Sequence, residues 1–115
     1  MPARAVLTAL TVVLLLSDQA FADCKEPEIG TKEVPAFLPP LSAVVVGKGR
    51  LQFYSAPGPN CAITGVFVIP KDELIAYAQS SNEWSSVMYS NPRTGKSVTG
   101  WVKSSRLKKT GNVGQ

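Results

Sequence analysis

The chain of 115 residues contains no histidine and only two cysteines. It therefore lacks the side chain that most often serves as a general base and as a zinc ligand. This excludes Ser-His-Asp and Cys-His nucleophile pairs, and two cysteines are too few for an all-cysteine zinc site. The length allows one small domain and excludes multidomain catalysis. We expect no metal ion and no cofactor.

The first 22 residues have the features of a secretory signal peptide. Arg4 provides positive charge, an apolar run follows from 6 to 16, and Ala20-Phe21-Ala22 places small residues at the positions that a signal peptidase reads. Cleavage is therefore expected before Asp23. The alternative, a transmembrane anchor, needs roughly 20 apolar residues, and this run has about 11. We expect a periplasmic or secreted protein without stable membrane insertion.

Export permits a disulfide, and the two cysteines, Cys24 and Cys61, allow one intramolecular pairing. A bond between them would close a loop of about 38 residues and stabilise the fold by roughly 4 kcal/mol on chain-entropy grounds. The alternatives are two free thiols or an intermolecular bridge.

Residues 23–40 are expected to form an extended lead-in rather than a core element. Prolines interrupt helices and remove backbone donors from sheets, and this segment contains Pro27, Pro35, Pro39 and Pro40. A Cys24–Cys61 bond would strap the segment across the domain. Without the bond it would be a tether.

Residues 41–109 have the pattern of an all-β domain, because short apolar or alternating runs are separated by turn residues. The expected strands are 44–46, 51–54, 63–69, 74–78, 84–89 and 98–102. Gly65 marks a bulge or bend. Residues 104–107 should form a short helical turn or a closing strand, and residues 110–115 should fray. The spacing is typical of a small barrel or sandwich.

Several motifs keep an order and approximate spacing that point to a known family. They are Leu51-Gln52-Phe53-Tyr54-Ser55-Ala56-Pro57, Gly65, Asp72, Trp84 with Val87, and Gly100-Trp101-Val102 followed by Arg106-Leu107. Together they resemble bacterial SH3-like (SH3b) domains over residues 44 to about 108. Phe53-Tyr54 and Lys71 depart from the family pattern. The resemblance implies an SH3-like barrel of five to six short strands in the cell envelope, where some members bind peptidoglycan peptides.

Three aromatic residues are candidates for a ligand groove: Tyr54, Trp84 and Trp101. Each alternates with apolar residues expected in the core, so each should lie on the outward face of its strand. Exposed rings beside a rigid loop can hold extended peptides. The alternatives are packing roles: a tyrosine that covers a strand edge, a packed Trp84, and a Trp101 that closes the end of the barrel.

Met88 shares the face of Trp84 and would add a soft, adaptable contact, and Arg106 would lie at the rim of the groove. Arg106 also belongs to a basic stretch with Lys96, Lys103, Lys108 and Lys109. That stretch is either an ordinary solvated surface or a patch that attracts an anionic envelope component. Export disfavours nucleic acid as the partner.

The carboxylates within residues 41–109 are Asp72, Glu73 and Glu83. A glycosidase needs two carboxyl groups that face one sugar, and adjacent residues of a strand point to opposite faces. Turn formation and solubility are the roles expected for these side chains.

The sequence thus predicts a non-catalytic binding module that recognises a peptide or a peptidoglycan fragment. The groove would be formed by Tyr54, Trp84, Met88, Trp101 and Arg106. The alternatives are an inhibitor or immunity factor, with the loop at residues 56–60 plugging the cleft of an envelope-acting toxin or hydrolase, and a subunit of an envelope complex.

Overall fold

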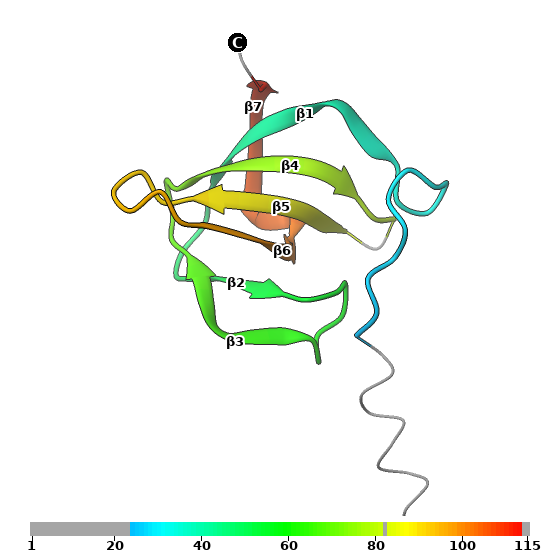
Figure 1. The fold of residues 1–115 in the computed structure, drawn as a ribbon, viewed down its shortest axis with the longest axis horizontal. Helices are drawn as coiled ribbons and strands as arrows, with labels where there is room; N and C mark the ends of the chain where they lie inside the picture. The colour runs from blue at the N-terminus through cyan, green and yellow to red at the C-terminus, as the bar shows by residue number, and fades with distance from the viewer. Residues whose placement is uncertain (1–23, 82, 114–115) are drawn as a thin grey trace, which may run out of the picture.

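The computed structural model describes residues 24–81 and 83–113 (Figure 1). Over these residues the chain forms strands, one 3-10 turn and no α-helix. The elements are β1 (Ala36–Val45), β2 (Leu51–Tyr54), β3 (Ala62–Val68), β4 (Glu73–Gln79), β5 (Trp84–Ser90), β6 (Ser97–Lys103), η3 (Ser104–Arg106) and β7 (Leu107–Asn112). The expected signal peptide, residues 1–22, lies outside the described residues.

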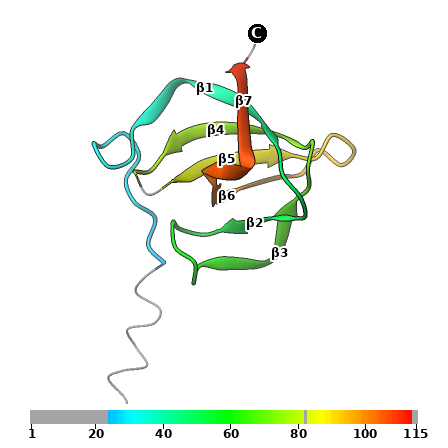
Figure 2. The same ribbon diagram turned by 180° about the vertical axis from the view of Figure 1, so that it is seen from behind.

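The seven strands form one antiparallel sheet with the order β3-β2-β6-β5-β4-β1-β7. The all-β prediction is confirmed. The sheet has one strand more than the five to six expected, and it is open, because β3 and β7 lie at its two edges. Figures 1 and 2 show that it is strongly curved, with β2 and β3 turned away from β1 and β4.

Strand β7 corrects the expectation of a frayed tail for residues 110–112, because it continues to Asn112. Residues 114–115, also expected to fray, lie outside the described residues. It pairs with β1, with Leu41 opposite Asn112 and Val45 opposite Leu107. The free edge of β1 supplies hydrogen-bond partners that the sequence of the tail does not reveal.

The expectation that residues 23–40 contain no element of the sheet is also corrected, because β1 begins at Ala36. Pro39 and Pro40 are tolerated there because they lie between Ala36 and Leu41, where the register with β4 shifts. A proline at such an irregularity removes no ladder hydrogen bond. In addition, Val34 is only 3% exposed, so the lead-in contributes to the interior.

Alternating residues of β1 to β6 form the main core on one side of the sheet. Its buried members are Val45, Leu51, Phe53, Val68, Leu74, Ala76, Val87 and Val102. Gly100 is buried beside this core, and a Cβ atom added to it would lie 2.9 Å from the Phe53 ring. The Gly100 position therefore needs a residue without a side chain.

The bulge expected at Gly65 is present in β3. The register between β2 and β3 shifts between Gln52 and Tyr54, and Gly65 has a φ of 78°. The Gln52 side chain bridges the bulge, because its Nε2 lies 2.7 Å from the Ile63 carbonyl oxygen and 3.0 Å from that of Val66. A glycine with positive φ and one long amide thus let β3 bend without losing its partners.

The intramolecular disulfide is confirmed. Cys24 and Cys61 are bonded, with their Cα atoms 5.5 Å apart. The bond joins the segment before β1 to the loop that leads into β3. In the part of the chain that the structure describes, no helix is long and apolar enough to cross a membrane.

Replacing Gly100 by alanine should lower the free energy of unfolding by about 1–3 kcal/mol, because the new methyl group collides with Phe53 and with the Tyr54 backbone. Urea denaturation followed by circular dichroism measures the change. The neighbouring Thr99→Ala variant, at an exposed position, should change stability by about 0.5 kcal/mol or less. Equal stability of the two variants would contradict this packing.

Reducing the Cys24–Cys61 bond should destabilise the fold by roughly 4 kcal/mol, because the unfolded chain regains the freedom of a long loop. Urea titrations with and without a reducing agent measure the difference. A Cys24→Ser, Cys61→Ser variant serves as the control. Its free energy of unfolding should equal that of the reduced protein and should not change when the reducing agent is added.

Candidate functional site

The face of the sheet opposite the main core carries a row of residues that links four strands. Tyr54 of β2 pairs with Trp101 of β6, Trp101 pairs with Ser86 of β5, and Ser86 pairs with Ala78 of β4. Directly paired residues point to the same side of a sheet. The sequence alternation had placed Tyr54 and Trp101 on this outer face, and the strand pairing agrees.

Residues 24–35, which we call the strap, cover this row. Val34 packs in one cluster with Ala78, Trp84 and Trp101, and Tyr54 lies against the cluster. The Glu26 carboxylate accepts a hydrogen bond of 2.9 Å from the Trp101 indole N–H. Figures 1 and 2 show the strap as the blue segment that runs from β1 past the ends of β4, β5 and β6 toward the β2–β3 loop.

Of the alternatives left open for the two indoles, the structure favours packing over an exposed ligand groove: Trp84 is 4% exposed and Trp101 is fully buried. The reason is that a segment distant in sequence covers an outward-facing row. The three predicted aromatic residues do come together, since the Tyr54 and Trp84 rings make a T-shaped contact with centroids 4.7 Å apart. They form a packed cluster in this structure, not an open groove.

Arg106 does not lie at the rim of an open groove, so this expectation is also corrected. Its guanidinium holds the β1–β2 loop: Nε donates to the Val46 carbonyl oxygen at 2.6 Å and Nη2 to that of Gly49 at 2.7 Å. Gly47 leaves room for it, because a Cβ atom there would collide with the Arg106 side chain. Arg106 is a structural residue of this loop.

Arg106→Ala should lower the free energy of unfolding by about 2 kcal/mol, because it leaves carbonyl groups of the β1–β2 loop without their charged donor. Lys108→Ala is the matched control, since it removes one positive charge from an exposed position nearby in sequence. Thermal or urea unfolding separates the two. A similar loss in both variants would mean that charge, and not the loop contacts, matters.

The basic stretch around Arg106 is distributed over separate neighbours. The Lys103 ammonium lies 4.6 Å from the Trp84 ring, and that of Lys109 lies 4.8 Å from the Phe37 ring and donates to Gln79. Lys96 and Lys108 are exposed. These contacts fit a solvated basic surface better than one concentrated anion site.

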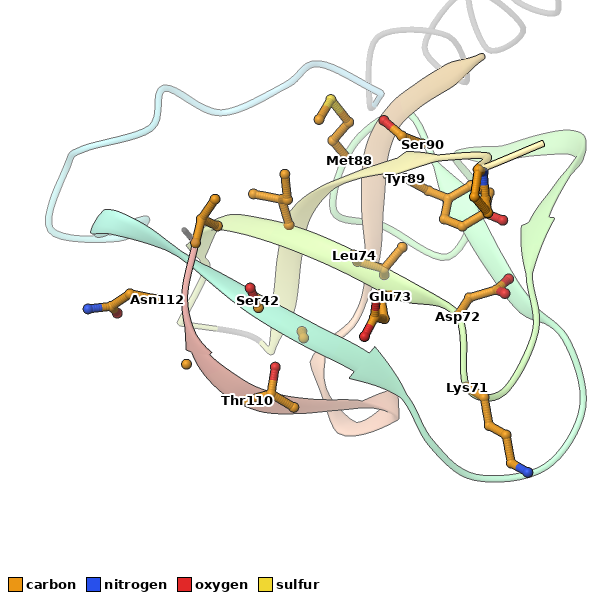
Figure 3. Close-up of a pocket in the computed structure, with 15 residues that line it drawn as sticks. Ser42, Lys71, Asp72, Glu73, Leu74, Met88, Tyr89, Ser90, Thr110 and Asn112 are labelled. Carbon is orange, nitrogen blue, oxygen red and sulfur yellow. The ribbon is translucent and has the colours of Figure 1, made fainter. Parts of the chain in front are cut away.

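The other half of the outer face carries a groove of about 910 Å³. Its floor is a second cross-strand row, in which Met88 pairs with Ile75, Ile75 with Ser42, and Ser42 with Gly111. Figure 3 shows the side chains that surround it. They come from β1, β4, β5 and β7, from the turn before β4, from Pro92 in the loop after β5 and from Val113 after β7. Of the five predicted ligand-binding residues, Met88 lines this groove.

The groove combines apolar and polar groups, because its floor carries Ile75 and Met88 beside Ser42. Ile75 and Met88 are half-buried, and the Tyr77 hydroxyl lies 3.8 Å from Met88 Sδ. Hydroxyl groups and carboxylates line its sides. The Asp72 carboxylate accepts a 3.0 Å hydrogen bond from the Ile69 N–H, so Asp72 has the turn-forming role that the sequence predicted.

Sequence reasoning missed Ile75, although a signal was present. In β4 the buried residues Leu74 and Ala76 alternate with Glu73, Ile75 and Tyr77. Ile75 is thus an apolar residue at a position that should face outward. The part formed by the end of β7 had no signal, because residues 110–115 were expected to fray.

Among the described residues, no group of three His, Cys, Asp or Glu side chains could hold a metal ion. No protein-family model matches the chain, and neither a curated protein nor a solved structure shows significant similarity to it. The site's own geometry is therefore the basis for a functional conclusion.

Proposed function

We propose that this protein is a non-catalytic binding module that holds an extended peptide or a peptide-bearing cell-wall fragment. The binding site is the open groove over Ser42, Ile75 and Met88. One observation carries this proposal: the chain covers the aromatic half of its outer face with its own strap and leaves the Ile75–Met88 half open.

The composition of the groove supports an extended peptide as the ligand. Ile75 and Met88 offer apolar surface, and methionine adapts its shape to different partners. Hydroxyl groups of Ser42, Ser90 and Thr110 line the groove and can bind backbone groups. Ligand sites usually combine apolar surface with a small number of polar groups at fixed positions.

The location and the family are part of the same proposal. We place the protein in the periplasm or outside the cell, after removal of residues 1–22, and we regard the domain as SH3-like. The Cys24–Cys61 bond supports export, because disulfides persist in oxidising compartments. The motif order from Leu51 to Leu107 supports the SH3-like assignment and, through it, a cell-wall ligand.

Ile75→Ser and Met88→Ala should each weaken binding of soluble peptidoglycan peptides by about tenfold, which corresponds to roughly 1.4 kcal/mol. Each substitution removes apolar contact area from the floor of the groove. Isothermal titration calorimetry of the oxidised protein with purified muropeptides measures the affinity.

Leu38→Ser is the matched control for the groove variants. Leu38 is 87% exposed on β1 and does not line the groove, so its loss should leave binding unchanged. Binding that survives both groove substitutions in folded protein would overturn the groove as the site. Absence of binding by the unaltered protein would overturn the ligand class.

A second candidate function is protein–protein inhibition through residues 56–60. This loop is braced at its base: the Ser55 N–H donates to the Cys61 carbonyl oxygen at 2.9 Å, and Cys61 is bonded to Cys24. Pro59 and Asn60 are exposed in this loop. A rigid exposed loop suits insertion into an enzyme cleft, because little freedom is lost on binding.

Retention experiments distinguish the two functions. Cosedimentation with purified sacculi, lost in Met88→Ala, supports the wall-binding module. One stoichiometric protein partner in a periplasmic pull-down, lost when Asn60 is replaced by a bulky residue and kept in Met88→Ala, supports inhibition.

A further inference from the structure

The strap is held firmly at its two ends and lightly between them. One end is the Cys24–Cys61 disulfide. The other end is the buried Val34, flanked by hydrogen bonds from the Ser81 N–H to the Glu33 carbonyl oxygen and from the Gln79 N–H to that of Pro35. The strap is thus fixed to the loop before β3 by a covalent bond and to β4 by packing.

Between these ends the strap is largely exposed to solvent. Ile29, its largest apolar side chain there, is 42% exposed. Within the described residues 25–32, the side-chain hydrogen bond to the sheet is that of Glu26 with Trp101. A segment with so little buried area opens more easily than the strands beneath it.

The surface beneath the strap has the chemistry of a peptide-binding platform. Trp84 and Tyr54 offer two rings at an interplanar angle of 77°. Beside them the Trp101 indole N–H needs an acceptor, which Glu26 provides. Ala78 and Ser86 are small and leave room for an aliphatic side chain, which Val34 provides.

We propose that the Tyr54–Trp84–Trp101 surface is a second binding site, that the strap is its displaceable cover, and that opening the Cys24–Cys61 bond makes the site available. The ligand class follows from the strap itself. It is an extended, acidic peptide with a carboxylate that reaches the Trp101 N–H and an aliphatic side chain that packs on Ala78 and Trp84. This site is separate from the groove over Met88.

Opening the bond requires a dithiol or another thiol reductant. The reductant transfers two electrons to the Cys24–Cys61 disulfide, which becomes two thiols, while the dithiol becomes a disulfide. The strap is then attached firmly to the domain only at its Val34 end. In the oxidised protein, by contrast, the tethered strap competes with any free peptide at an effective concentration on the order of millimolar.

Tryptophan fluorescence reports directly whether the strap covers the surface, because both tryptophans of the chain lie under the strap. We expect dithiothreitol to raise the acrylamide quenching of the folded protein, with the far-ultraviolet circular dichroism unchanged. The Cys24→Ser, Cys61→Ser variant should show the raised quenching without reductant and should not respond to it. Unchanged quenching in folded, fully reduced protein would mean that the strap does not open.

Binding in trans tests the ligand class. The probe is a synthetic peptide with the sequence of residues 25–35, acetylated, amidated and labelled with fluorescein. The receptor is the full chain with Glu26→Gln and Val34→Ser, which weaken the strap and leave the surface intact. We expect the peptide to bind the reduced form of this variant at least about tenfold more tightly than the oxidised form of the same variant.

Matched peptides and one surface variant complete the test. Peptides carrying Glu26→Gln or Val34→Ser should bind more weakly than the unaltered peptide. With Trp101→Phe in the receptor, the unaltered peptide and the Glu26→Gln peptide should bind with equal affinity. Met88→Ala in the receptor should have no effect, which separates this site from the groove. Equal affinity in both redox states, or equal affinity of all the peptides, would overturn the proposal. If Trp101→Phe does not fold, the Glu26→Gln peptide still tests the carboxylate contact.

Discussion

The burial of Trp101 is the constraint on which the rest of this structure depends. The residue lies on the face of β6 that turns away from the main core, yet it is fully buried. A large apolar ring in that place must be covered by another part of the chain, and its N–H must have an acceptor. The strap meets both needs through Val34 and Glu26. The disulfide at Cys24 keeps the strap in position.

The parts of the fold that depend on local pattern were predictable from the sequence. Two-residue alternation placed Leu51 and Phe53 in the core and Tyr54 on the outer face. The turn residues between runs gave the bounds of β2 to β6 to within a few positions. The disulfide was predictable because only two cysteines were present. The bulge at Gly65 was predictable because glycine inside a strand favours one.

The parts that depend on distant contacts were not predictable. Glu26 contacts Trp101 across 75 positions of sequence, and nothing in the type of either residue indicates that the two are hydrogen-bonded. Arg106 looked like a surface cation because its acceptors are carbonyl oxygens of the β1–β2 loop, which have no sequence signature. The groove could not be predicted without β7. Nothing in Thr110 or Asn112 indicates a strand, because β7 forms only through its pairing with β1.

The place of β1 between β4 and β7 has a consequence for biogenesis. The first strand of the sheet has the last strand as one of its two neighbours, so the sheet cannot be completed until residues 107–112 have been synthesised. Contacts so far apart in the chain also form slowly, since a long loop must close first. A nascent chain with this strand order therefore stays incompletely folded until β7 is available to pair with β1.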